Sequence, residues 1–325
     1  MTTLLDRADQ RASVTPAQWL RDTTAATRVS FTWMGVRKTL TPAQKGQAAE
    51  SFGAEADFLS ARKKLLDTKH PAFKEVTAVR GKVGSFWKSL TLPFPEPGIR
   101  LIRQHEVQRF NEQMTAYRME LGDAVARLEE HFSELKAAAR RRLGDLFDAS
   151  DYPASLRGLF AVDWDYPAIE APDYLLQLNP AIYEQERSRI AARFQEAVLL
   201  AEQAFISEFA KLIEHLCERL GDGGDGQRKV FRDSAVDNLA DFFQRFRQLN
   251  VGSNAELDAL VDRARQIVRG VEPQALRDNA GLRQHVASQL TGVQAVIDGM
   301  LVNQPRRRII RSQTSTTGDH HEPRD

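Results

Sequence analysis

The chain has 325 residues, which is enough for one long domain or two small ones. Hydrophobic residues make up 42% of it and charged residues 27%, proportions that are usual for a soluble globular protein. The net charge of +1 gives the chain as a whole no attraction to nucleic acid or to a membrane surface. Cys217 is the single cysteine, which excludes an internal disulfide framework and fits a reducing compartment.

The sequence gives no indication of export or of insertion into a membrane. No apolar run follows Arg7 and Arg11, so a signal peptide is not expected. No stretch approaches the roughly 20 consecutive apolar residues of a membrane span. We therefore expect a cytoplasmic protein without a membrane partner.

The first 103 residues predict a loose lead-in and then a small mixed part. Residues 1–26 are the lead-in, with a short helix after Thr15-Pro16. Between residues 27 and 103, the alternation of Val29, Phe31 and Trp33 predicts a strand, and 99–102 predicts a second strand that pairs with it. Helices are expected in between, at residues 41–52, 58–66 and 71–90.

Residues 104–147 predict one long helix. Apolar side chains recur there at steps of three and four from Val107 to Leu128, at Val107, Phe110, Met114, Tyr117, Leu121, Ala124 and Leu128, and Leu135 follows seven residues later with Phe132 flanking. This spacing is typical of a helix that packs along its whole length. At about 1.5 Å per residue the helix would be roughly 60 Å long.

A second long helix is predicted at 181–220, after a connector at 148–180 that is rich in Tyr, Pro and Asp. Two helices of similar length joined in this way suggest a long antiparallel hairpin over 104–220. The alternative is that each helix has a separate dimer seam.

Three segments complete the chain. A glycine-rich linker is expected at 221–227, a helical part at 228–303 and a disordered tail at 304–325. The fold class predicted from these elements is predominantly all-α, with an elongated coiled-coil hairpin, a small N-terminal strand pair and a C-terminal helical part.

No motif for catalysis, cofactor or metal binding survives scrutiny. Gly221, Gly223 and Gly226 match G-x-G-x-x-G, but a long predicted helix precedes them where a dinucleotide site needs a strand. The histidines lack both Glu-x-x-His and H-E-x-x-H spacing. Asp163 and Asp165 could form a carboxylate pair, although capping of turns is the commoner role of such aspartates. We therefore predict no catalytic, cofactor-binding or metal-binding residues, and no enzyme.

Charge is distributed unevenly along the chain. A basic stretch lies within 62–103, and its candidate contact residues are Arg62, Lys63, Lys64, Lys74, Arg80, Lys82 and Lys88. The tail adds Arg306, Arg307 and Arg308. An acidic stretch lies within 145–186, and its candidate contact residues are Asp148, Asp151, Asp163, Asp165 and Asp173.

Three interpretations of this asymmetry stay open. The two stretches could be complementary surfaces for assembly. The basic stretch and the tail could instead contact nucleic acid. The third interpretation is that both are ordinary solvated surfaces that lie near each other in the fold.

Three short stretches resemble a family of uncharacterised bacterial and phage proteins, a domain of unknown function. They are the run 29–38, Pro-Gly-Ile-Arg-Leu-Ile at 97–102 and Phe-Arg-Gln-Leu-Asn at 246–250. Members of that family are often encoded near a MoxR-type AAA ATPase and a protein with a von Willebrand A domain. The resemblance spans residues 27–303, implies a partner in an ATPase-linked assembly and supplies no catalytic residues.

These observations predict a non-enzymatic interaction or scaffold protein that binds a protein partner or itself. The alternative is a nucleic-acid-binding accessory protein that uses the basic stretch and the tail. The sequence identifies neither the partner nor the number of subunits.

Overall fold

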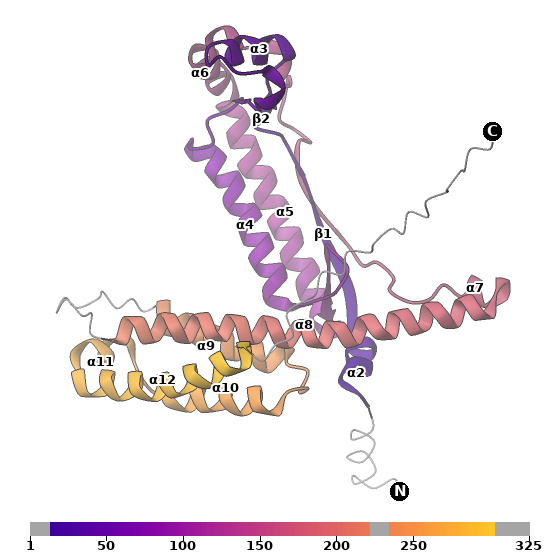
Figure 1. Cartoon of the computed structure of the whole chain (residues 1–325), viewed down its shortest axis with the longest axis vertical. Coiled ribbons are helices and arrows are strands. Elements are labelled where there is room, and N and C mark those ends of the chain that lie inside the picture. The colour runs from indigo at the N-terminus through magenta and orange to yellow at the C-terminus, as the bar shows by residue number, and fades with distance from the viewer. Residues whose placement is uncertain (1–13, 222–233, 303–325) are drawn as a thin grey trace, which may run out of the picture. The chain divides into compact units, whose positions relative to one another are not determined.

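The computed structural model describes residues 14–221 and 234–302 and is predominantly helical (Figure 1). The described residues form two compact units. Unit one comprises those within Met1–Phe205 and Ala240–Val261, and unit two those within Ile206–Leu239 and Asp262–Asp325. Most of the predicted linker 221–227, the tail 304–325 and the first half of the lead-in lie outside the described residues.

Unit one contains a four-stranded antiparallel sheet in the order β4-β5-β1-β6. Its strands are β1 (Thr24–Trp33), β4 (Thr91–Pro93), β5 (Ile99–Arg103) and β6 (Phe160–Asp165). The first half of β1 pairs with β5, from Thr24 opposite Arg103 to Arg28 opposite Ile99. The second half pairs with β6 and ends at Trp33 opposite Phe160. The predicted pairing of the first strand with 99–102 is thus confirmed, whereas β6 was not predicted.

Helices α4 (Pro71–Leu90) and α5 (Val107–Glu130) lie side by side and supply much of the core of unit one (Figure 1). Pro71 occupies the first turn of α4, where its missing N–H costs no hydrogen bond. The predicted apolar face of α4 is buried at Phe73, Val76, Val79 and Val83. On α5, the buried seam residues are Phe110, Met114, Leu121, Ala124 and Leu128.

The single helix predicted over 104–147 is wrong in its length. Residues 104–106 form a 3-10 turn, α5 ends at Glu130 and a separate helix, α6, runs over Phe132–Leu143. At the break, the N–H of His131 bonds to the carbonyl of Leu128, three residues back. The apolar period continues across the break because Leu128 and Leu135 are both buried. Hydrophobic spacing alone therefore cannot reveal it.

The helix predicted at 58–66 is also wrong. A 3-10 turn covers Ala56–Phe58, and β3 (Arg62–Lys64) pairs with β2 (Arg37–Thr39) in a separate two-stranded sheet. The neighbouring predictions hold, with α2 at Pro16–Thr23 and α3 at Pro42–Glu50. Thr41 caps α3 through a reciprocal bond with Gln44.

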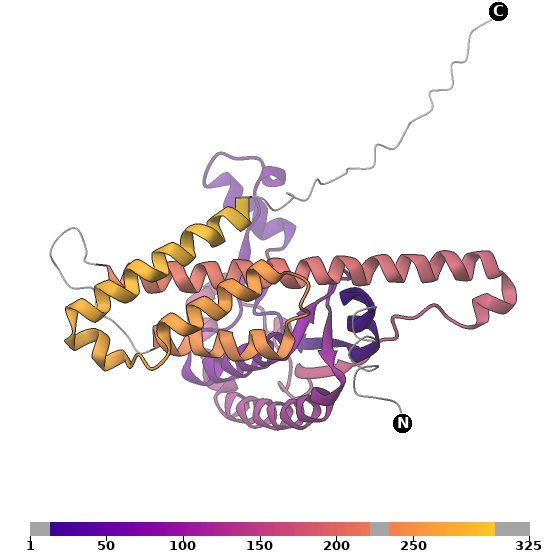
Figure 2. The same ribbon diagram turned by 90° about the horizontal axis from the view of Figure 1, so that it is seen from below.

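The connector contains 3-10 turns at Gly144–Leu146 and Ala149–Asp151, then β6 and the short helix α7 (Tyr174–Leu178). Helix α8 (Pro180–Leu220) follows as one continuous helix of 41 residues, as predicted, and Figures 1 and 2 both show α7 folded at its N-terminal end. The hairpin of 104–147 with 181–220 is not confirmed, because α5 packs along α4.

Unit two is helical in its described part. Helices α9 (Ser234–Leu249) and α10 (Ala255–Val268) contribute residues to both units, while α11 (Pro273–Asp278) and α12 (Ala280–Val302) belong to unit two. Its core includes Phe209, Ile213 and Leu216 of α8 with Leu290 and Val293 of α12. Cys217 is half-buried there, and burial raises the pKa of its thiol, which also bonds to Thr291.

Candidate functional site

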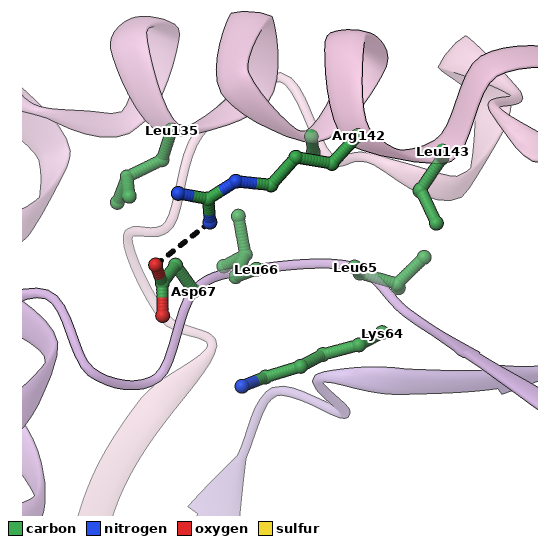
Figure 3. Close-up of a pocket in the computed structure, with 8 residues that line it drawn as sticks. Lys64, Leu65, Leu66, Asp67, Leu135, Arg142 and Leu143 are labelled. Carbon is green, nitrogen blue, oxygen red and sulfur yellow. Dashed lines mark hydrogen bonds and ion pairs between the residues drawn. The ribbon is translucent and has the colours of Figure 1, made fainter.

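A pocket of about 170 Å³ in unit one lies between the segment that follows β3 and helix α6 (Figure 3). The apolar part of its lining is Leu65, Leu66, Leu135, Ala139 and Leu143, and its polar part is Lys64, Asp67 and Arg142. Two bonds fix the β3 side, because the amide of Leu65 donates to the carbonyl of Val36 and its own carbonyl accepts from the Tyr152 hydroxyl.

The polar rim of this pocket carries one more positive charge than negative charge. Arg142 Nη1 donates to Asp67 Oδ2 at 2.7 Å, and the amide of Lys69 donates to Oδ1 of the same carboxylate. The hydrogen bond from Arg142 is the main reason that the pKa of Asp67 lies below its ordinary value, and the charge of Lys64 lowers it further. Lys64 is exposed and reaches along the pocket toward the side occupied by Asp67 (Figure 3).

A charge cluster with buried Lys63 and Asp151 side chains and a half-exposed Lys38 directly precedes the pocket residue Lys64 on β3. Lys63 Nζ lies 2.6 Å from Asp151 Oδ2 and donates to the carbonyl of Leu146 at 2.7 Å. Lys38 donates to the other oxygen of Asp151. These two lysines hold the pKa of the Asp151 carboxyl below its ordinary value, Lys38 by the larger contribution. The cluster fastens β2 and β3 to the turn at 149–151, which is a structural role.

The predicted basic face is only partly a free surface. Lys63 is buried in its ion pair, and Lys82 pairs with Glu120 at 2.6 Å. The guanidinium of Arg80 lies over the rings of Phe31 and Trp33, at 4.9 and 4.8 Å from their centroids. The remaining described members of that face are exposed, namely Arg62, Lys64, Lys74 and Lys88. Arg306, Arg307 and Arg308 lie outside the described residues.

The predicted acidic face is mostly engaged within the fold. Asp151 is buried, Asp163 pairs with Arg118 at 3.0 Å, and Asp165 pairs with Arg28 at 2.6 Å. Asp148 accepts from the amide and hydroxyl of Ser150 and so caps a turn. Asp173 is exposed. Asp163 and Asp165, the candidate carboxylate pair on β6, therefore each form an ion pair with an arginine from another element.

The acidic stretch also contains an unpacked helical segment, residues 172–189, which we call the exposed segment. It covers α7 and the first ten residues of α8, and none of its side chains is buried. Four of its large apolar side chains are exposed: Tyr174 at 60%, Leu176 at 50%, Leu178 at 76% and Ile182 at 45%. The first buried residue of α8 is Ile190. Apolar side chains grouped in this way on a protein surface are typical of a contact site.

This chain matches no family model, no curated protein and no solved structure. The resemblance drawn from residues 29–38, 97–102 and 246–250 thus stays an expectation.

Two further findings concern the described ranges 14–221 and 234–302. Within them, no helix is long and apolar enough to cross a membrane. The same residues contain no group of three or more His, Cys, Asp or Glu side chains that could hold a metal ion.

Sequence reasoning missed the pocket and the exposed segment for different reasons. The pocket depends on the β2–β3 pairing and on the break at His131, which bring 64–67 to α6. The exposed segment did leave a signal, because the apolar residues of the second long helix recur at steps of three and four only from Ile190 onward, while Leu176, Leu178 and Ile182 precede it. Apolar residues that lie outside the continuous apolar face of a helix are expected to be exposed.

Proposed function

We propose that this chain is a non-enzymatic protein-interaction subunit and that the exposed segment, residues 172–189, is its principal contact surface. The observation that carries the proposal is the group of four large apolar side chains on a helical stretch with no buried residue. Burying one such side chain in a partner stabilises a complex by about 1–2 kcal/mol, so a few of them are enough to hold one.

The chemistry of the segment favours a protein partner over a nucleic acid. No lysine or arginine occurs from Gly158 to Glu186, whereas Glu170 and Asp173 are exposed there. The segment's two arginines, Arg187 and Arg189, follow and are paired with Glu184 and Glu186. Phosphate groups would be repelled by the carboxylates of Glu170 and Asp173. Tyr174 and the leucines match the apolar core of a protein interface.

Nucleic-acid binding is the second candidate, and it relies on the exposed cations Arg62, Lys64, Lys74 and Lys88. It is weaker because Lys63, Arg80 and Lys82 have contacts within the fold. Binding of DNA at low salt that falls steeply toward physiological salt would favour it.

The test compares two variants of the full chain. Leu176→Asp combined with Leu178→Asp places charge on the exposed segment, and Met119→Asp is the matched control because Met119 is a 68% exposed apolar residue of α5. Each is analysed by size-exclusion chromatography with light scattering, alone and with a MoxR-type AAA ATPase, the partner that the resemblance implies.

We expect the double variant to lose complexes that the wild type and Met119→Asp both form, with an unchanged circular dichroism spectrum. A wild-type chain that is strictly monomeric and binds no partner would contradict the proposal. So would complexes that the double variant forms as well as the control.

A further inference from the structure

We propose that the partner of the exposed segment is a second copy of this chain, and that the segment inserts a leucine into the pocket between β3 and α6. This inference rests on the proposed function and names the partner of the same surface. The two surfaces are both in unit one, and residues 172–189 contribute nothing to the pocket lining within one chain.

Charge complementarity is the first argument. The approach to the exposed segment and most of the segment itself, residues 158–186, contain no lysine or arginine and expose Glu170 and Asp173. The two cations at the end of the segment, Arg187 and Arg189, are paired with Glu184 and Glu186. The pocket rim carries Lys64 and Arg142 against Asp67. Arg62 and Arg141 are exposed nearby in sequence and add positive charge. An acidic segment and a basic rim attract each other and select this pairing over one of like surfaces.

The shape and polarity of the pocket are the second argument. Its lining is mostly leucine and alanine, and its volume is about 170 Å³. A cavity of about 150 Å³ lined by apolar residues holds a benzene-sized molecule, so an isobutyl side chain fits. Leu176 and Leu178 are exposed and of this size. Insertion would place an apolar side chain against the leucine and alanine side chains that line this space.

The spacing within the exposed segment is the third argument. Asp173 stands at the N-cap of α7, three residues before Leu176. Residues three apart on a helical turn lie on one side, so an inserted Leu176 brings the Asp173 carboxylate to the same face. The ammonium of Lys64 at the rim would then be its partner, because Lys64 forms no ion pair within the described residues whereas Arg142 is held by Asp67.

In a single contact one copy donates the segment and the other the pocket, so one segment and one pocket stay unused. Two copies can close reciprocally as a two-fold dimer, or further copies can add to form a ring or an open chain. The average mass in solution should therefore rise with protein concentration and fall with added salt.

The experiment measures self-association of the full chain at low salt, as the anisotropy of a trace of fluorescein-labelled chain titrated with unlabelled chain. We expect association that weakens by about tenfold with Lys64→Glu, and little change with Lys88→Glu, a matched reversal at an exposed lysine of α4. Asp173→Lys combined with Lys64→Glu should restore the association that either change alone weakens. Leu176→Asp with Leu178→Asp should abolish it.

Absence of self-association by the wild-type chain would overturn this inference, and so would equal losses for Lys64→Glu and Lys88→Glu. Because the proposed function is tested with a separate partner, the two outcomes are distinguishable. If the full chain binds an ATPase through the exposed segment but stays monomeric when alone, only the self-association fails.

Discussion

The ammonium of Lys63 and the carboxylate of Asp151 lie 2.6 Å apart, with 4% and 1% of their side chains exposed. These residues come from the basic and the acidic stretch of the sequence. Part of the uneven charge is thus neutralised inside the fold by this ion pair, which joins β3 to the turn at 149–151. Only the unpaired remainder is available for contact with a partner.

Replacing Asp151 by asparagine should lower the free energy of unfolding by about 3–4 kcal/mol. The change keeps the shape of the side chain but leaves the buried Lys63 ammonium without its counter-charge, which costs more than the lost attraction alone. Urea unfolding followed by circular dichroism measures it. Asp173→Asn is the control, since Asp173 is exposed and its replacement should leave the midpoint close to that of the wild type. Equal midpoints for both variants would contradict the structural role of the cluster.

The same cluster predicts an acid dependence of stability. Lys38 and Lys63 hold the pKa of Asp151 below its ordinary value of 3.8. The folded protein therefore binds this proton less readily than the unfolded chain does. The stabilising contribution is complete above the ordinary value and is lost as pH falls through the lowered pKa. Urea midpoints measured between about pH 3 and pH 7 should fall less steeply at the acid end for Asp151→Asn than for the wild type. Parallel curves of urea midpoint against pH for the two proteins would count against this acid dependence.

Asn111 on α5 anchors the end of β6. Its Oδ1 accepts from Trp164 Nε1 at 2.6 Å and from the Tyr166 hydroxyl at 2.9 Å. Asn111→Ala should destabilise the protein by about 1–2 kcal/mol, because Trp164 loses its partner in a partly buried position. With 5-fluorotryptophan at the four tryptophans, one ¹⁹F resonance should shift. Gln108→Ala, on the exposed side of the same helix, should shift none. An unchanged ¹⁹F spectrum for Asn111→Ala would contradict the anchoring role of Asn111.

Arg103 joins β5 to two helices of unit one. Its guanidinium donates to the Thr23 hydroxyl and to the carbonyls of Leu249 and Asn250, and it lies 3.8 Å from the ring centroid of Trp19. Burial lowers its pKa to about 10.

Arg103→Lys should cost about 2–3 kcal/mol of unfolding free energy, because the compact ammonium lacks the planar guanidinium that reaches Thr23 from one nitrogen and two carbonyls from another while it stacks on an indole. Arg109→Lys is the control at an exposed pair with Glu106. Thermal unfolding compares the two variants. A melting temperature of Arg103→Lys as high as that of Arg109→Lys would show that the junction does not need the guanidinium.

Local pattern predicted those elements whose apolar faces are continuous. The alternation at Val29, Phe31 and Trp33 located β1, and the face from Phe73 to Val83 located α4. In both elements the local sequence pattern and the tertiary packing favour the same secondary structure, so the local pattern is enough to predict it.

The misses occurred where contacts distant in sequence decide the structure. Glu129 Oε2 accepts from the amide of Leu156, and the ring of His131 lies 5.1 Å from that of His70, both at the unpredicted break between α5 and α6. Strand β3 has the sequence Arg-Lys-Lys and so shows no apolar alternation. Its central residue, Lys63, is nevertheless buried, because it forms an ion pair with Asp151. Strand β6 did show alternation at Phe160, Val162 and Trp164, which the surrounding prolines obscured.

Hydrogen exchange at residues 172–189 tests the central claim most directly. In a free helical surface with no buried side chain, amide exchange is governed by local opening alone. We predict that exchange in this segment slows by about tenfold when the full chain is concentrated or given its partner, and that Leu176→Asp with Leu178→Asp removes the effect. Exchange that stays equally fast under every one of these conditions would contradict a contact surface here.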